Sequence, residues 1–177
     1  MARILVTGGV RSGKSRYAEG LLDAAAPAIY LTPGYPADPA ADPEWAARVD
    51  SHQARRPAGW RTVETLDLAS IIASADAPVL VDCLGVWVTR LFDSWDAWDA
   101  APADWQERLD TELANLATAV AACPEVTLVT NEVGWGLVSE YRAGRVFADQ
   151  LGRTNQAVAA VCDEVVLMVA GRPLVVR

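Results

Sequence analysis

Residues 3 to 15 read RILVTGGVRSGKS, and this stretch decides the fold. Its first part, RILVT, is a short apolar run typical of a buried strand. The next eight residues, GGVRSGKS at 8–15, match the pattern G-x-x-x-x-G-K-[ST] in full, and the apolar residues of 15–26 recur at helical spacing. A strand, a glycine loop and a helix in this order predict a phosphate-binding loop, with an ordinary glycine turn as the alternative.

Each part of such a loop has a physical task. Gly8 and Gly13 permit backbone angles that turn N–H groups inward, Lys14 neutralises the β and γ phosphate oxygens, and Ser15 can hold Mg²⁺. The loop therefore predicts binding of nucleotide phosphates, but it does not say which phosphorus is attacked. The predicted nucleotide-binding residues here are Gly8, Gly9, Val10, Arg11, Ser12, Gly13, Lys14 and Ser15.

Further apolar runs at 28–31, 78–83, 126–132 and 164–169 look like buried strands, and helical patterns separate them. Continuous apolar strands that alternate with helices predict a mainly parallel sheet that is covered on both faces. The expected fold class is therefore α/β, a P-loop (RecA-like) three-layer sandwich with a mostly parallel sheet. The length favours a single domain over residues 1–177.

Composition narrows the functional classes. The net charge of −8 opposes nucleic-acid binding, which needs a cationic surface. No apolar run approaches the ~20 residues that span a bilayer, and no signal peptide opens the chain, so a cytoplasmic protein without membrane insertion is expected. Cys83, Cys123 and Cys162 lie far apart and are expected to be buried thiols. For the tryptophan-rich segment SWDAWDAAPADW (94–105), packing is favoured over ligand stacking.

An acidic residue ends the apolar strand PVLVDC at 78–83. Mg²⁺ at a phosphate loop normally needs a second protein contact from an acid at the end of a neighbouring strand. Asp82 is the predicted metal ligand, and capping of the following helix is the alternative. Glu132, after VTLVTN, is a weaker candidate for the same acidic cluster.

The segment RVDSHQARRPAGW at 48–60 contains the only histidine of the chain, His52. Asp42 and Pro43 predict the start of a helix over 43–54, after a mobile Pro/Gly-rich loop over 32–43. Arginines near His52 form a cationic surface that favours neutral imidazole, which could attack phosphorus and hold the transferred group. From the residues alone, the alternative that the arginines simply clamp phosphate stays open.

Four segments in this order resemble one enzyme family over nearly the whole chain: RILVTGGVRSGKSRYAE, RVDSHQARRPAGWRTVE, VLVDCLGVWVTRL and LVTNEVGWGLVSEYRAGRVFADQLGRTNQAVA. The family is the bifunctional adenosylcobinamide kinase / adenosylcobinamide-phosphate guanylyltransferase of cobalamin biosynthesis. The resemblance implies phosphorylation of adenosylcobinamide with ATP or GTP, followed by GMP transfer from GTP through a guanylylated histidine. It also implies Mg²⁺ as cofactor and a homotrimer.

Residue by residue, the resemblance assigns the guanylylated position to His52 and a metal or hydroxyl-side carboxylate to Asp82. Other residues of the second segment, Gln53, Arg55, Arg56 and Glu64, are expected to bind nucleotide. Gly85, Arg90, Ser139 and Ala148 depart from the residues usual in the family, and these departures bear on substrate contacts. A corrinoid groove edged by Trp87 or Trp135 is expected. A monofunctional small-molecule kinase and a nucleotide-controlled switch protein are the alternatives.

Overall fold

The computed structural model describes residues 2–176, except for the side chains of Arg48 and His52. Within this range one sheet has the strand order β3-β2-β4-β5-β1-β6-β7. The strands are β1 (Arg3–Gly8), β2 (Ala28–Thr32), β3 (Trp60–Glu64), β4 (Val79–Asp82), β5 (Val126–Val129), β6 (Glu164–Val169) and β7 (Arg172–Val175). The helices are α1 (Lys14–Glu19), α2 (Pro43–Gln53), α3 (Leu68–Ala73), α4 (Leu84–Ser94), α5 (Pro102–Ala122) and α6 (Arg142–Val161).

The sheet is parallel except for its last strand. β1 lies between β5 and β6 and runs parallel to both, whereas β7 pairs antiparallel with β6. Asp82 at the end of β4 pairs with Val129 at the end of β5, so both strands end at the same edge as the glycine loop after β1. The predicted α/β fold with a mostly parallel sheet is confirmed.

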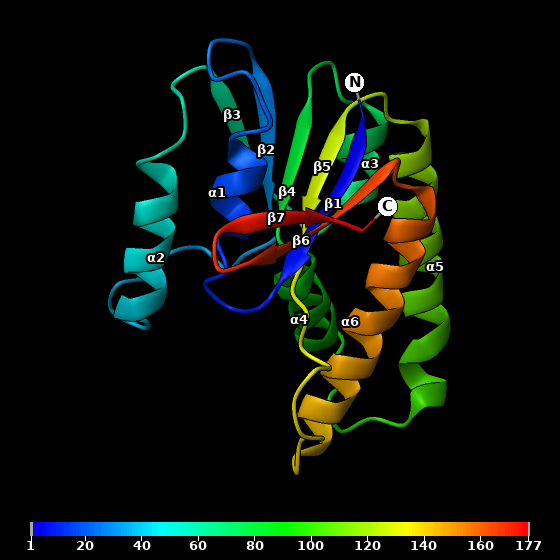
Figure 1. Ribbon diagram of the computed structural model, residues 1–177. Helices are drawn as coiled ribbons and strands as arrows, with labels where there is room; N and C mark the ends of the chain where they lie inside the picture. Colours follow the sequence, from blue (N-terminus) through cyan, green and yellow to red (C-terminus); the bar gives the residue numbers. More distant parts are fainter. Residues whose placement is uncertain (1, 177) are drawn as a thin grey trace.

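Both faces of the sheet are covered (Figure 1). Leu5 packs into a core with α3, α4, α5 and α6, whereas its neighbour Val6 packs into a second core with Ala18 of α1. Because successive residues of these strands point to opposite faces, both must be apolar, which explains the continuous apolar runs. Helix α2 lies at the outer edge of the molecule, on the same side as α1 (Figure 1).

Three elements differ from the sequence prediction. The helix expected over 15–26 ends at Glu19, since Gly20 caps it and Asp23 forms a turn by accepting a hydrogen bond from the Ala25 N–H at 2.9 Å. β3 was not predicted, because this edge strand is mostly exposed and lacks an apolar run. β7 was also not predicted, and it is exposed along its whole length.

The tryptophan-rich segment packs, as expected. The ring centroids of Trp98 and Trp105 each lie 4.9 Å from that of Phe92. Trp87 is also buried and donates its indole N–H to the Leu66 carbonyl at 2.9 Å, so of the two tryptophans expected at a corrinoid groove Trp87 is ruled out and Trp135 stays a prediction. Trp135 is exposed. In the described part of the chain, no helix has the length and apolarity needed to cross a membrane.

Candidate active site

The glycine loop takes backbone angles that require its glycines. Gly8 has φ 145° and Gly13 has φ 95°, a region that residues with a side chain rarely adopt. A Cβ on Gly8 would also lie 2.6 Å from the Met168 carbonyl oxygen. Lys14 follows directly, and its buried side chain donates to the Gly9 carbonyl at 2.7 Å. The loop therefore folds around its lysine, as a phosphate-binding loop does.

The turn between β6 and β7 supports the loop from the other side. The Gly171 N–H donates to the Ser12 carbonyl at 3.0 Å. A Cβ on Gly13 would lie 3.4 Å from the Cα of Gly171, so the two backbones are in close contact. The last strand pair of the chain thus fixes the first functional loop.

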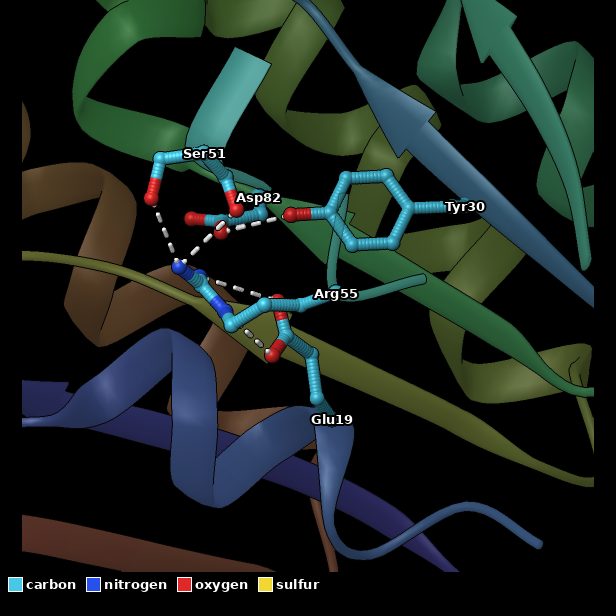
Figure 2. Close-up of polar contacts among 5 residues, drawn as sticks. All are labelled: Glu19, Tyr30, Ser51, Arg55 and Asp82. Carbon is cyan, nitrogen blue, oxygen red and sulfur yellow. Dashed lines mark hydrogen bonds and ion pairs between the residues drawn. The ribbon is translucent and has the colours of Figure 1, made fainter. Parts of the chain in front are cut away.

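Asp82 faces the loop from the end of β4. The hydroxyl of Tyr30 on β2 donates to Asp82 Oδ2 at 2.8 Å (Figure 2). Burial, together with the negative charge of Asp82, raises the pKa of Tyr30 above its ordinary value, so the phenol stays protonated and remains a donor. Burial and the same charge raise the pKa of the neighbouring Cys83 thiol to about 11, although the residue as a whole is partly exposed.

These groups share a cleft of about 790 Å³. Most of the predicted site residues line it together: Val10, Arg11, Ser12, Gly13, Lys14, Ser15, Gln53, Arg55, Arg56, Glu64 and Asp82. Gly8 and Gly9 lie at the base of the loop and are not among the described lining residues. The backbone of His52 belongs to α2, whereas its side chain lies outside the described residues.

Glu132 does not join Asp82 in an acidic cluster. Its carboxylate accepts a hydrogen bond from the Thr7 hydroxyl at 2.7 Å, and it is not among the described residues that line the cleft. Asn131, one position earlier, does line it. Gly85 leaves room for this amide, because a Cβ there would lie 3.1 Å from Asn131 Nδ2.

Arg56 and Ser12 give the cleft two polar atoms suited to a ligand. The Arg56 guanidinium carbon lies 3.7 Å from the centroid of the Tyr30 ring, and the same group donates to the Thr62 hydroxyl at 2.9 Å. Arg56 Nε and Ser12 Oγ are buried and have no hydrogen-bond partner among the described residues. Because both atoms are covered, each can donate to a phosphate or sugar oxygen only after a small shift of the cleft wall.

Helix α2 is capped at its start and is tied to α1 just past its end. Asp42 caps it by accepting from the Trp45 N–H at 2.9 Å, as its sequence predicted. Past the other end, Arg55 forms an ion pair with Glu19 of α1 at 3.4 Å and donates to the Ser51 carbonyl at 3.1 Å (Figure 2). Between these ends, Ala46 is the one buried residue among those whose exposure is described.

Arg90 of α4 fixes the start of the loop that precedes α2. Its guanidinium donates to the carbonyls of Pro33 and Gly34 at 3.0 and 2.9 Å and lies 4.7 Å from the centroid of the Tyr35 ring. The Tyr35 carbonyl in turn accepts the indole N–H of Trp45 at 2.9 Å. Arg90, a departure from the family pattern, therefore anchors a backbone segment to which Trp45 in turn ties the first turn of α2.

Ser15 and Asp82 suit a magnesium ion. A hydroxyl and a carboxylate are hard oxygen ligands, and Mg²⁺ at a nucleotide usually takes only one or two protein ligands beside phosphates and waters. Among the side chains that the structure describes, which do not include that of His52, no group of three or more acidic, histidine or cysteine residues is placed to hold a metal. Ser15 and Asp82 would thus supply the protein's share of the ligands, with the remainder from phosphate and water.

Sequence reasoning missed Tyr30. It stands in the apolar run AIYL, where a tyrosine normally indicates core packing. The one available signal was its hydroxyl, because a buried phenol needs a hydrogen-bond partner. Only the register of β2 against β4 shows that the partner is Asp82.

The chain is similar to three curated proteins over almost their whole lengths. The bifunctional adenosylcobalamin biosynthesis protein CobU of Salmonella typhimurium is 42% identical over 95% of this chain and 96% of its own. The protein of the same name from Escherichia coli is 40% identical over 95% and 96%. The bifunctional adenosylcobalamin biosynthesis protein CobP of Pseudomonas aeruginosa is 38% identical over 97% and 95%.

Among solved structures, the P4 protein from bacteriophage phi6 in complex with ADP is a weak match, with a TM-score of 0.45 and 18% identity over 98% of this chain and 54% of that chain. A family model described as cobinamide kinase / cobinamide phosphate guanyltransferase matches residues 4–176. With a match of that extent and curated relatives near 40% identity, the chain belongs to the cobinamide kinase / cobinamide phosphate guanyltransferase family.

Proposed function

We propose that the protein phosphorylates adenosylcobinamide with ATP or GTP, and then transfers GMP from GTP to that phosphate through a histidine–GMP intermediate on His52. The products of the second reaction are adenosylcobinamide-GDP and pyrophosphate. The observation that carries the proposal is the shared cleft. The phosphate loop lines it together with Gln53 and Arg55, which lie one and three positions after His52. Membership of the family supplies the substrate class.

In the first transfer, the hydroxyl oxygen of the substrate attacks the γ-phosphorus. The bond from this phosphorus to the bridging oxygen breaks, and the nucleoside diphosphate leaves. Lys14 stabilises the charge on the phosphate oxygens, and Asp82 is the proposed acceptor of the hydroxyl proton. Ser15 and Asp82 would hold Mg²⁺, which neutralises phosphate charge when bound.

In the second reaction, an imidazole nitrogen of His52 attacks the α-phosphorus of GTP, and the bond to the β-phosphate oxygen breaks to release pyrophosphate. A phosphate oxygen of the substrate then attacks the same phosphorus, and the P–N bond breaks. In-line attack needs the imidazole within roughly 3 to 3.5 Å of the phosphorus. Helix α2 must therefore approach the loop. Only Ala46 is buried among the helix residues whose exposure is described, and this light packing favours such a movement.

A radiolabel on the α-phosphate of GTP tests the proposal. The wild-type protein is expected to form an acid-labile, base-stable adduct, which His52→Ala abolishes while much of the kinase activity remains. Asp50→Ala, an exposed change on the same helix, serves as the matched control and should keep the adduct. Equal loss of both activities in a folded His52→Ala protein would contradict the division of labour.

The same experiment separates the two alternatives. Kinase turnover without any labelled adduct would indicate a monofunctional kinase, in which the arginines only hold phosphate. Slow hydrolysis that adenosylcobinamide does not stimulate would indicate a nucleotide-controlled switch protein.

We also propose a cytoplasmic homotrimer whose 177 residues form a single domain. A surface for other subunits is available in the segment after β5, where Trp135, Leu137 and Val138 are exposed. Exposed apolar side chains that lie together favour contact with another protein surface. Sedimentation equilibrium is expected to give three times the chain mass of 18.9 kDa, and a monomer mass would refute this part.

A further inference from the structure

Tyr30 is a buried residue of the cleft to which the reactions above give no role. It lies in the middle of β2, paired with Leu80 of β4, and is 1% exposed. Asp82 stands two residues further along β4 and therefore points to the same face of the sheet as Leu80. The Tyr30 hydroxyl extends along this face and donates to Asp82 Oδ2 at 2.8 Å (Figure 2).

The ring of Tyr30 has a second contact with the site. The guanidinium of Arg56 lies over its face, 3.7 Å from the centroid. Arg56 also donates to Thr62, which pairs with Tyr30 across β2 and β3. A cation over an aromatic face is held by the ring quadrupole. One side chain thus touches a carboxylate on one side of the cleft and a cation from the segment after α2.

We infer that Tyr30 is a positioning residue for both transfers, which fixes the orientation of the Asp82 carboxylate toward the nucleotide-bound metal and supports Arg56 beside the phosphates. The assignment rests on the role of Asp82 in the proposed function. A carboxylate turns easily about its terminal torsion, which is broad and roughly two-fold. A hydrogen bond to one oxygen removes much of that freedom, and such outer partners set the affinity of metal sites.

A purely structural role for Tyr30 predicts something different. In that case the bond to Asp82 only satisfies a buried hydroxyl, and its removal lowers the thermal stability without changing metal affinity. Tyr30→Phe separates the two, because it deletes one oxygen and keeps the ring that packs on Arg56 and stacks on Trp60.

The direct measurement is the affinity for Mn²⁺, followed by electron paramagnetic resonance with the β,γ-imido analogue of GTP bound. Tyr30→Phe is expected to weaken Mn²⁺ binding about ten-fold. Binding of the analogue without metal should stay unchanged, since the glycine loop is untouched. In turnover assays, the half-saturating Mg²⁺ concentration should rise by the same factor for both activities.

Two controls make the result specific. Tyr141→Phe removes a phenol oxygen from an exposed residue and should leave the Mn²⁺ affinity at the wild-type value. In an Asp82→Asn background, Tyr30→Phe should cause no additional loss, because the two residues act through one contact. Unchanged Mn²⁺ affinity in folded Tyr30→Phe, or fully additive losses in the double variant, would overturn the inference.

The metal measurement needs no corrinoid, so the two proposals can fail separately. If the wild-type protein shows no cobinamide kinase activity but Tyr30→Phe still weakens Mn²⁺ binding, the proposed function is refuted and the positioning role stands. A wild-type protein that binds the analogue with no metal dependence would overturn the positioning role itself.

Discussion

The glycine loop and helix α2 form two sides of one cleft, and they are built in opposite ways. The loop is held from below by β1, from within by the Lys14 bond to Gly9, and from the side by the contact of Gly171 with Ser12. Helix α2 has one buried residue among those whose exposure is described, and it is joined to its surroundings through the Trp45 bond to the Tyr35 carbonyl and the Arg55 ion pair with Glu19.

The difference corresponds to two chemical requirements. A phosphate site that serves two transfers must keep its donors in place, because preorganised donors stabilise charge without reorganisation. In the proposed mechanism, the His52 nucleophile of the second reaction must reach the α-phosphorus and then leave room for the second substrate. Weak attachment suits that task, since elements that move come from the least stable parts of a fold.

The largest effect is expected at the loop. Lys14→Ala should lower both activities by about 10²–10³, the range for loss of one donor to a charged transition state. Steady-state rates of both reactions, with nucleotide near saturation, measure this. Lys14→Arg keeps the positive charge and should recover part of the loss. A Lys14→Ala protein that still formed the labelled histidine adduct at the wild-type rate would break the comparison.

The reactivity of the Cys83 thiol, next to Asp82, tests how rigid the β4 side of the cleft is. With its pKa raised to about 11 from 9.0, Cys83 should carry about 100-fold less thiolate near pH 8 than in the unfolded chain. Alkylation of Cys83 by iodoacetamide, followed site by site with mass spectrometry in the absence of Mg²⁺, should be slower by that factor and should speed up ten-fold per pH unit until about pH 11. Native alkylation as fast as in urea would show that this side opens readily.

The smallest effect is expected at the anchor of α2. Arg90→Ala removes the bonds to the Pro33 and Gly34 carbonyls and should reduce local stability by about 1–2 kcal/mol. Hydrogen exchange should accelerate over residues 33–53 and stay unchanged over 8–15. Guanylyl transfer should fall several-fold more than phosphorylation.

Arg108→Ala is the matched control for this anchor, because Arg108 also lies over an aromatic ring, at 4.5 Å from Trp95, but on α5 outside the cleft. Equal acceleration of exchange in the loop and in α2 would refute the distinction between the two regions.

Sequence reasoning located the central strands because each is buried on both faces. Val6 and Leu5 must both be apolar, and that requirement leaves a visible run. The edge strands β3 and β7 have no continuous apolar run. β3 exposes most of its residues, and β7 contains Arg172 and Pro173. Their strand character comes from pairing with β2 and β6, which is a property of the whole sheet.

The site divides in a similar way. Lys14 and Asp82 were predictable because their tasks fix their positions, after a glycine loop and at the end of a strand. Tyr30 was not, since its hydroxyl finds Asp82 only through the register of neighbouring strands. The anchoring contacts of Arg90 were hidden for the same reason, because they link α4 to backbone carbonyls far away in sequence.

The place of β1 in the sheet has a consequence for synthesis on the ribosome. This strand pairs with β5 and β6, so its first partner begins at Val126 and its second at Glu164. Until both partner strands have left the exit tunnel, β1 is unpaired and the glycine loop lacks its contact with Gly171. The nascent chain therefore cannot yet bind a triphosphate. Such long-range pairing slows folding. Nucleotide can therefore assist folding of this enzyme only after the chain has been translated past β6.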